Sequence, residues 1–272
     1  MDARAFYDGL GDDYDVMVSW EERLAREESF LRGLFAERGA TRVLDAGCGT
    51  GMHAVAFARW GLQTAAADLS PAMVARAREN ARATGAEIAF AVAGFGEIGR
   101  ALPGPFDAVT CLGNSLPHLL DDASLAAALA DFAAVLVPGG VLVIQNRNYD
   151  RLLREKVRFM PLTTRADADG ETIFLRVTDF LGGERLDFTI VTLKKRGGVW
   201  GQSAQTTPLR AIRRETLARA LAYAGFPAAD FSGNYARAPF DSPGTGDLLA
   251  VAAREGGAGL RPNAPREPRR SP

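Results

Sequence analysis

A chain of 272 residues suits one large domain, or one domain with a small insertion, and it can bury a substantial hydrophobic core. Its formal net charge is −1, so no overall basic field favours nucleic acid or an anionic membrane as a partner. The two cysteines have no metal-ligand spacing and make a disulfide framework implausible, so we expect no metal site. Because no apolar run approaches about 20 residues and the acidic N-terminus lacks an apolar core, we expect a soluble, cytoplasmic protein.

The first 38 residues predict a helix and, before it, a segment rich in aromatic rings. From residue 20 to residue 38, apolar side chains recur on one face, which is typical of a helix that packs against a core. Tyr7, Tyr14 and Trp20 are amphipathic rings in a stretch with few aliphatic residues, so this segment is also a candidate lid over a pocket. We count Tyr14, Trp20 and Arg23 among the candidate cofactor contacts.

An apolar run that ends in an acid and a ladder of glycines occupies residues 41–51, TRVLDAGCGTG. Val43 and Leu44 predict the end of a buried strand, and residues 52–60 carry apolar side chains at helical spacing. The glycines between them fit a turn, because glycine tolerates positive φ and lets the backbone lie against a ligand. The helix N-terminus that follows offers unpaired N–H groups.

The spacing of the glycines separates this turn from that of the dinucleotide-binding fold. The Rossmann fingerprint G-x-G-x-x-G would need a glycine at position 52, where the chain has Met52. The pattern present, D-x-G-x-G-x-G, resembles motif I of the class I S-adenosylmethionine (SAM) methyltransferases, in which the acid sits near the amino-acid end of the cofactor. Asp45, Gly47 and Gly49 are candidate SAM contacts, and the alternative is a tight turn without a ligand.

The next strand supplies a second acid. Residues 63–67 predict a strand that ends at Asp68, and Ser70 and Pro71 suit the N-cap and first position of a helix that reaches about residue 83. An acid roughly 20 residues after the turn, at the end of the second strand, is placed to accept both hydroxyls of a ribose. The alternative is that Asp68 only caps the helix. Two neighbours join the candidate cofactor contacts: Leu69 and Met73.

Residues 88–92 predict a third strand, and Gly94 and Phe95 follow it. The adenine lies beside this strand end in such a fold, so Phe95 is a candidate to stack on it, although a core aromatic fits equally well. A fourth strand at residues 105–112 ends with another candidate contact, Leu112.

The following helix, residues 125–137, can be capped by Asp122 or Ser124. It stops at residues 138–140, Pro-Gly-Gly, and residues 141–144 predict a fifth strand. Strands that alternate with helices predict an α/β fold with a doubly wound, mostly parallel, seven-stranded Rossmann-like sheet. Ligands bind such sheets beyond the carboxyl ends of the strands.

From about residue 159 the pattern changes to apolar and polar alternation, which predicts an antiparallel insertion of about three strands, at residues 172–180, 185–194 and 205–212. A helix at residues 215–224 and strands near 226–231 and at 247–253 then complete the core sheet. The expected division is an N-terminal lid and helical segment 1–38, a SAM-binding core 39–150, an antiparallel insertion that covers the substrate 156–212, a C-terminal part of the core sheet 213–254 and a disordered tail 255–272.

Two further stretches resemble the glycine N-methyltransferases and their glycine/sarcosine relatives: CLGNSLPHLLD at 111–121 and PGGVLVIQNRNYD at 138–150. The resemblance implies that Arg147 binds the carboxylate of an amino-acid substrate, a task suited to a bidentate guanidinium. It also implies that Asn114 helps to orient the substrate amine, that His118 lies beside it and that Tyr149 supports Arg147. From the residues alone, a turn asparagine, a loop histidine and a surface ion pair remain open.

The chain departs from that family at Gln145 and Asn146, where the relatives have Asp and His, and just ahead of Glu215, where they have tyrosines. These departures put glycine itself in doubt as the substrate, and Arg210 is a further candidate for an anion contact. The expected function is SAM-dependent transfer of a methyl group to the nitrogen of a small amine or amino acid, by in-line displacement.

Other functions remain open. The alternatives are a small-molecule O- or C-methyltransferase of secondary metabolism and a SAM-binding protein without catalysis. The fourth strand leads into LGNS rather than the [ND]-P-P-[YF] tetrapeptide of base-amino methylases, which argues against a nucleic-acid substrate. Homo-oligomerisation stays open.

Overall fold

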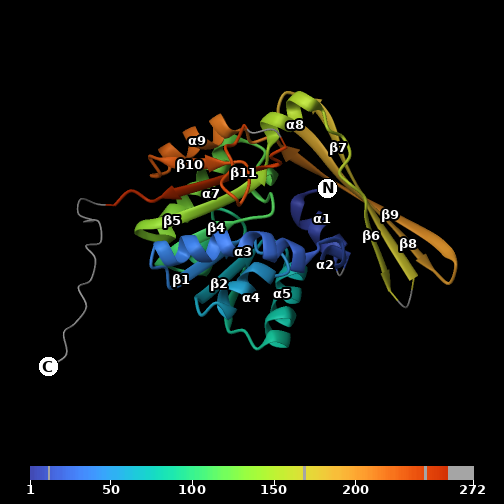
Figure 1. Ribbon diagram of the computed structural model, residues 1–272, viewed down its shortest axis with the longest axis horizontal. Helices are drawn as coiled ribbons and strands as arrows, with labels where there is room; N and C mark the ends of the chain where they lie inside the picture. The colour runs from blue at the N-terminus through green and yellow to red at the C-terminus, as the bar shows by residue number, and fades with distance from the viewer. Residues whose placement is uncertain (12, 168–169, 242–243, 257–272) are drawn as a thin grey trace.

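The computed structural model describes residues 1–11, 13–167, 170–241 and 244–256, and contains two β-sheets. The larger sheet has the strand order β10-β11-β5-β4-β1-β2-β3 (Figure 1). Neighbouring strands run parallel, except that β11 is antiparallel to both β5 and β10. The sheet is therefore mostly parallel and doubly wound, as predicted. Its strands are β1 Arg42–Ala46, β2 Gln63–Asp68, β3 Ile88–Val92, β4 Phe106–Cys111, β5 Leu136–Arg147, β10 Ala229–Ser232 and β11 Asp247–Ala253.

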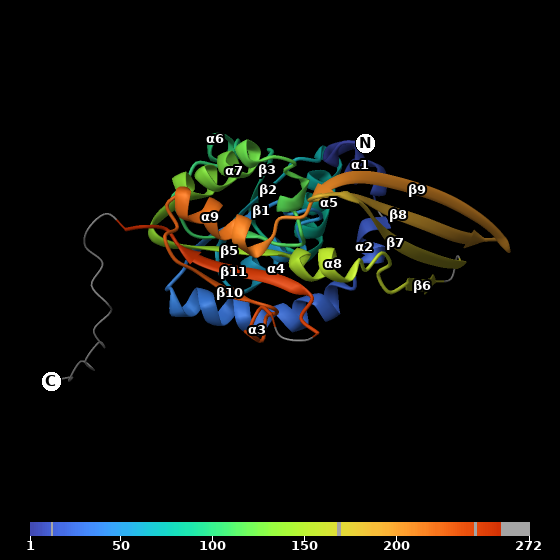
Figure 2. The same cartoon turned by 90° about the horizontal axis from the view of Figure 1, so that it is seen from above.

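Helices cover both faces of this sheet (Figure 2). One face carries α3 Trp20–Glu37, α4 Met52–Arg59 and α5 Pro71–Thr84. The other carries α6 Ile98–Ala101, α7 Asp122–Val135 and α9 Arg214–Tyr223. The remaining described helices are α1 Ala3–Leu10, α2 Asp13–Met17, the 3₁₀ turn η1 Leu116–His118 and α8 Tyr149–Glu155.

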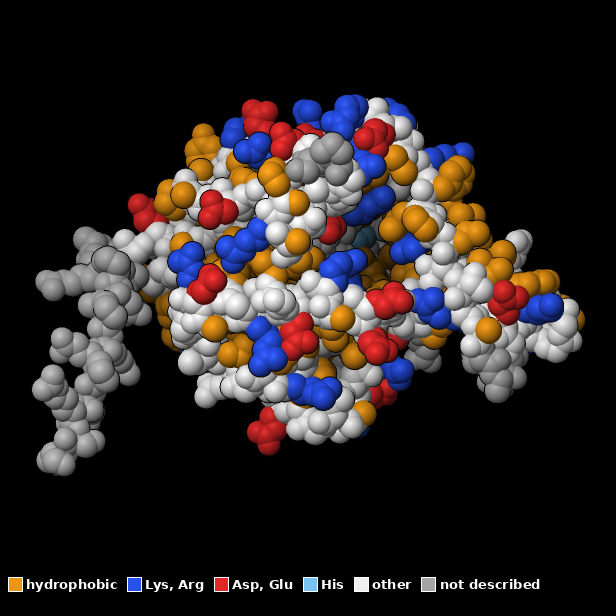
Figure 3. All heavy atoms as spheres, viewed as in Figure 1, with side chains coloured by type: hydrophobic (Ala, Val, Ile, Leu, Met, Phe, Trp, Pro, Cys, Tyr) orange, Lys and Arg blue, Asp and Glu red, His pale blue; other side chains and the backbone are white. Residues whose placement is uncertain are grey.

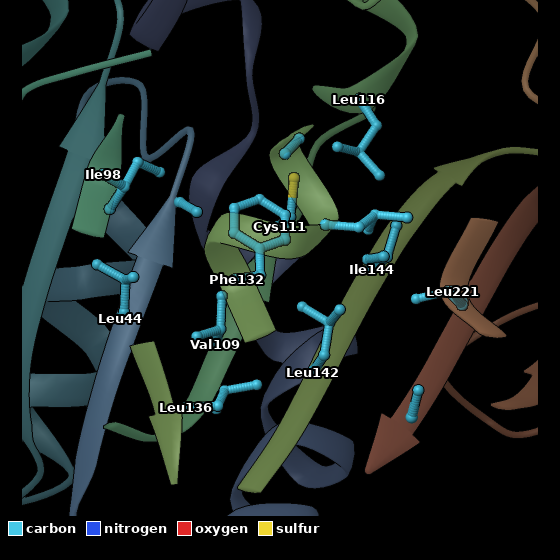
Figure 4. Packing of buried hydrophobic residues seen from close by; sticks show 14 of the residues in the cluster. Leu44, Ile98, Val109, Cys111, Leu116, Phe132, Leu136, Leu142, Ile144 and Leu221 are labelled. Atoms are coloured by element: carbon cyan, nitrogen blue, oxygen red, sulfur yellow. The ribbon is translucent and has the colours of Figure 1, made fainter. Parts of the chain in front are cut away.

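Alternation along the strands explains why both faces are covered. Successive side chains of a strand point to opposite faces, so Val43 packs with Phe57 on one side of β1 while Leu44 packs on the other. On that second side, Phe132 of α7 lies over Val109 of β4 (Figure 4). A strand apolar on both faces must be buried on both, which requires two helical layers.

The smaller sheet is antiparallel, with the order β6-β7-β8-β9. Its strands are β6 Thr163–Asp167, β7 Gly170–Gly182, β8 Arg185–Arg196 and β9 Val199–Arg210. They extend away from the core, and α1 and α2 lie between this sheet and the core (Figure 1). Phe6 of α1 joins the two, since it packs in one cluster with Met73 of α5 and with Phe174 and Ile190 of the small sheet.

Several expectations need correction. The cap of α7 is Asp121, whose side chain accepts a hydrogen bond from the Ser124 backbone, and neither Asp122 nor Ser124 is the N-cap. The fifth strand begins at Leu136 rather than at 141, because Leu136 pairs with Phe106 across an irregularity in the ladder. The insertion has four described strands instead of three. The predicted tail from residue 257 onward lies outside the described residues.

The helix that follows β2 matches its sequence signals. Ser70 accepts a hydrogen bond from the Met73 backbone and is the N-cap of α5, and Pro71 occupies its first turn. None of the helices in the described ranges is long and apolar enough to cross a membrane.

Candidate functional site

The glycines of the turn after β1 have two different structural roles. Gly47 and Gly49 have φ of +75° and +54° and line a cavity at the carboxyl ends of the strands. Gly51, with φ of +77°, faces α5 instead, where a Cβ would lie 2.7 Å from the Cβ of Ala77. The first two glycines therefore open a space, and the third lets two helices approach.

This first cavity has a volume of about 320 Å³, and we call it the cofactor cavity. It lies at the ends of β1, β2, β3 and β4, where an open α/β sheet binds its ligand. Most of the predicted cofactor contacts line it: Tyr14, Trp20, Arg23, Gly47, Gly49, Asp68, Leu69, Gly94, Phe95 and Leu112. These residues come from five separate stretches of sequence, so the fold brings together what the motifs suggested one by one.

Asp68 links the second strand to the glycine turn. One carboxylate oxygen accepts a hydrogen bond from the Gly49 backbone at 2.8 Å, and the other accepts one from the Ser70 backbone at 2.9 Å. Burial raises the pKa of this carboxyl although both hydrogen bonds oppose the rise. Each oxygen keeps a second lone pair, so the carboxylate can still accept hydroxyl groups of a ligand.

Two of the predicted cofactor contacts do not line the cavity. Asp45 lies within β1, paired with β2 and β4, and its side chain accepts a hydrogen bond from Thr110 at 3.0 Å. The other oxygen, Oδ2, is buried without a hydrogen-bond partner, and burial raises the pKa of the group. Met73 points away from the ligand space into the apolar cluster with Phe6, because the N-cap at Ser70 sets its position in the first turn of α5.

Phe95 has both of the roles that the sequence left open. Its ring lines the cofactor cavity, and it also packs edge-on against Phe132, with ring centroids 5.6 Å apart. A Cβ at Gly47 would lie 3.1 Å from the Phe95 ring, so this aromatic closes one side of the glycine turn.

The N-terminal segment is fastened to the glycine turn by Asp15. Its Oδ1 accepts hydrogen bonds from Thr50 Oγ1 at 2.6 Å and from the Trp20 indole at 2.8 Å. Behind this contact, the buried Glu27 carboxylate binds His53 at 2.6 Å and Arg23 at 3.1 Å. Burial alone would raise the pKa of Glu27, but the hydrogen bond and charge of His53, with those of Arg23, lower it to about 2.

A second cavity, of about 470 Å³, adjoins the first, and we call it the acceptor cavity. Its walls come from α1 to α3, from the loop after β4, from the end of β5 and from the small sheet. Figure 3 shows a hollow between the core and the small sheet with Lys and Arg side chains gathered around it. The same five residues line both cavities, so the two spaces meet at Tyr7, Tyr14, Arg23, Gly113 and His118.

Asn114 ties the loop after β4 to the end of β5. Its side-chain amide donates to the Tyr149 hydroxyl at 3.0 Å, and its Oδ1 accepts from the Arg147 backbone at 2.9 Å. The residue has a φ of +66°, a conformation that asparagine tolerates better than most residues. Its side chain thus sets the position of Arg147 while it also lines the acceptor cavity.

Tyr149 is buried and lies outside both cavity walls. Burial raises the pKa of its hydroxyl to about 12, with the Asn114 hydrogen bond acting the other way. It therefore stays protonated, and its hydrogen bond with Asn114 links it to the Arg147 backbone.

His118 lies where the two cavities meet. Its Nε2 is 3.1 Å from the Tyr7 hydroxyl, and its Nδ1 is buried without a hydrogen-bond partner. Burial lowers the pKa of this imidazole to about 4, so the ring is neutral near pH 7.

Arg147 lines the acceptor cavity as a half-buried cation. Its Nη1 donates to Thr178 of β7 at 3.5 Å, and no carboxylate lies within ion-pair distance of it in the described ranges. Burial lowers the pKa of this guanidinium.

The other candidate cation, Arg210, is held at 2.7 Å by Asp122 and at 3.1 Å by Glu184. It lines neither cavity, so the expected anion contact is wrong.

Of the two β5 residues that differ from the resembled family, only Gln145 has side-chain hydrogen-bond partners among the described residues. Gln145 accepts from the Gly113 backbone at 2.9 Å and donates to Asp247 at 2.9 Å, which joins β5 to β11 beneath the acceptor cavity. Asn146 is fully buried, and neither polar atom of its side chain has a partner.

Sequence reasoning missed Arg165 and Arg176, which also line the acceptor cavity. The available signal was weak: Arg176 interrupts an alternating strand on the face that Phe174 and Thr178 share. Only the packing of the small sheet against the core shows that this face turns inward.

Comparisons with known proteins agree with this architecture. Residues 43–140 match a family described as "Methyltransferase domain". The chain is 38% identical over 148 residues to a glycine/sarcosine N-methyltransferase of Halorhodospira halochloris, which covers 54% of this chain and 55% of that protein. The chain thus spans about half the length of the curated relatives it matches.

Two solved structures resemble nearly the whole chain. SAM-bound CalS10, an amino pentose methyltransferase from Micromonospora echinaspora, is 27% identical, with a TM-score of 0.67 over 87% of this chain and 92% of that one. The sugar N-methyltransferase KedS8 from Streptoalloteichus is 26% identical, with a TM-score of 0.69 over 92% of both chains. With its glycine turn and sheet order, the chain has the Rossmann-like fold of SAM-dependent methyltransferases, contains a methyltransferase domain at residues 43–140 and is similar to glycine and sarcosine N-methyltransferases.

Proposed function

We propose that the chain transfers a methyl group from SAM to the nitrogen of a small amine or amino acid. One observation carries this proposal: the acceptor cavity and the cofactor cavity meet at Gly113 and His118, with Arg147 on the acceptor side. A methyl donor in one cavity and an amine in the other would meet at this junction. The similarity to glycine/sarcosine N-methyltransferases favours nitrogen as the acceptor atom.

The residues present fit the cofactor. Asp68 would accept the ribose hydroxyls, and Leu69, Phe95 and Leu112 offer apolar walls to the adenine. The buried Asp45 carboxyl, whose Oδ2 has no hydrogen-bond partner, lies just before the glycine turn and outside the cavity wall, where its charge would favour a cationic amino group in the cavity. When bound, SAM would supply a methyl group on a sulfonium, whose carbon an amine lone pair can attack while S-adenosylhomocysteine leaves as the neutral sulfide.

The chain's own residues would act by positioning and by exclusion of water. Arg147 would hold a carboxylate, and Asn114 would fix Arg147 through its backbone. A neutral His118 adds no positive charge beside a cationic methyl donor and does not repel an amine. Tyr7 and Tyr14 close the junction from the N-terminal side, which shields it from water.

Replacement of Arg147 by lysine tests the anchor. A screen of amino acids and small amines with SAM, followed as S-adenosylhomocysteine release, first identifies a substrate. In Arg147→Lys, loss of the bidentate contact is expected to raise KM for that substrate about tenfold or more, while kcat changes less. An unchanged KM would show that Arg147 does not bind the carboxylate.

A second candidate is N-methylation of an amino sugar. It is suggested by CalS10 and KedS8, an amino pentose and a sugar N-methyltransferase, whose structures superpose on about nine-tenths of the chain at 27% and 26% identity. Turnover of an amino sugar without a carboxylate, with the same KM in Arg147→Lys, would decide for it. Turnover of an acceptor that lacks an amine would decide instead for O- or C-methylation.

A further inference from the structure

The acceptor cavity contains more positive charge than one carboxylate requires. Three guanidinium groups face it from three strands: Arg147 from β5, Arg165 from β6 and Arg176 from β7. Within the described side chains, no carboxylate forms an ion pair with any of them. An acceptor with a single carboxylate would leave two of these cations without a counter-charge.

The three cations are held by neutral groups and lie within reach of one another. Arg176 donates to the Pro161 carbonyl at 3.1 Å and to the Thr163 hydroxyl at 3.0 Å, while its Nε is buried without a partner. Arg165 donates to the Ser19 hydroxyl and to the Thr164 carbonyl. Burial, followed by the charges of Arg147 and Arg165, lowers the pKa of Arg176. Such an arrangement places uncompensated positive charge at one end of the cavity.

The acidic groups on the cavity wall offset this positive charge only in part. Arg23 and Arg26 both bind Glu27, so that carboxylate is already in use. Asp247 accepts a hydrogen bond from Gln145, and its charge acts on Arg147 although the two form no ion pair. Glu22 is exposed on α3. The cation cluster therefore faces the cavity, where a ligand can reach it.

We propose that the methyl acceptor carries a second anionic group, bound by Arg176 and Arg165, in addition to the group bound by Arg147. This inference rests on the proposed function, because it describes the acceptor of the same reaction. A carboxylate and a phosphate monoester share the chemistry that such a pair of guanidinium groups recognises. The cluster thus selects an acceptor with at least two negative charges.

Pairs of substrates that differ by one anionic group measure this selection. They also show whether the second anionic group is a carboxylate or a phosphate. Aspartate against asparagine tests a second carboxylate, and O-phosphoserine against serine tests a phosphate. The wild-type enzyme is expected to show a kcat/KM at least about tenfold higher for one anionic member than for its neutral counterpart. Arg176→Gln should reduce that ratio about tenfold. Arg176→Lys, which keeps the charge, should restore part of it.

The control is Arg158→Gln. Arg158 is an exposed cation beside β7 that pairs with Asp179 at 2.7 Å and lies outside the acceptor cavity. Arg158→Gln also removes one positive charge close to the small sheet, but outside the acceptor cavity. It should therefore leave the kcat/KM ratio of each substrate pair unchanged. Equal kcat/KM within both pairs, or an equal loss of the ratio in Arg158→Gln, would overturn the inference.

A binding measurement distinguishes failure of this inference from failure of the proposed function. Protein loaded with S-adenosylhomocysteine is titrated with glutarate, with butyrate and with inorganic phosphate. Tighter binding of glutarate or phosphate than of butyrate, lost in Arg176→Gln and kept in Arg158→Gln, supports the inference even where no amine is methylated. Methylation of neutral and anionic amines alike, with equal binding of glutarate and butyrate, rejects the inference and leaves N-methylation standing.

Discussion

At the scale of single residues, burial of His118 predicts a loss of stability in mild acid. Its pKa is about 4 in the folded chain and 6.5 in the reference state, so the unfolded chain binds the proton more readily. The stabilisation is complete above pH 6.5 and is lost as the pH falls towards 4. From this group alone, the free energy of unfolding should be roughly 2 kcal/mol lower at pH 5 than at pH 7.5.

Urea unfolding of wild type and His118→Asn at these two pH values measures the effect. The variant should lose most of this difference, because asparagine does not titrate. Tyr7→Phe is the control, since it removes the hydroxyl near Nε2 but keeps the imidazole, and it should retain the wild-type pH dependence. Parallel pH dependence in wild type and His118→Asn would show that this histidine is not the titrating group.

The residues of the site differ in how far sequence could identify them. Gly47, Gly49 and Asp68 follow from local rules, because a turn and a strand end fix where their backbones lie. Arg147 was identified from a resemblance to a family. Sequence alone could not show that its guanidinium has no carboxylate partner among the described residues, because the fold decides which groups lie near it. Arg176 could not be found, since the face of an insertion strand is decided by the element packed against it.

At the scale of elements, the glycine turn predicts two separable effects of an added methyl group. Gly47→Ala strains a backbone with φ of +75° and places a Cβ 3.1 Å from Phe95 and Ser115, inside the cofactor cavity wall. Gly61→Ala introduces the same kind of strain, at φ of +88°, with nothing within 4 Å of the new atom. Both should cost about 1 kcal/mol of stability.

Only Gly47→Ala should also weaken the affinity for S-adenosylhomocysteine, by about tenfold or more, measured by isothermal titration. The added atom narrows the cavity, whereas the change at Gly61 is remote from it. Equal affinity in the two variants would mean that Gly47 serves the backbone alone and that the ligand does not approach it.

Elements with a strong apolar period could be predicted, and those that depend on distant packing could not. The bounds of β3 and β11 agree with the sequence, since each is a compact apolar run between turn residues. The start of β5 was missed because residues 138–140 predict a stop, yet Leu136 pairs across an irregular ladder. The short helix α1 was missed because its buried side chains, Phe6 and Leu10, gain their partners from other elements.

At the scale of the whole molecule, the acceptor cavity exists only where three parts of the chain meet. The core sheet supplies Arg147, the small sheet supplies Arg176, and the N-terminal helices supply Tyr7 and Tyr14. Phe6 lies among these parts, 1% exposed and packed with Met73 and Phe174. Its contacts therefore set how the small sheet sits against the core.

Phe6→Ala should destabilise the fold by about 3–5 kcal/mol, the usual cost of a buried phenylalanine. It should also raise KM for the acceptor several-fold, because Phe6 lines the acceptor cavity itself and because the strand that carries Arg176 loses its apolar contact with the core. Leu221→Ala, in α9 on the far face, removes an equally buried side chain away from both cavities and should cost stability without a change in KM. Urea midpoints and acceptor KM, measured at a temperature where both variants are folded, separate the two effects. If KM rises equally in both variants, a general loss of stability accounts for the rise, and the contacts of Phe6 have no specific role in positioning the small sheet against the core.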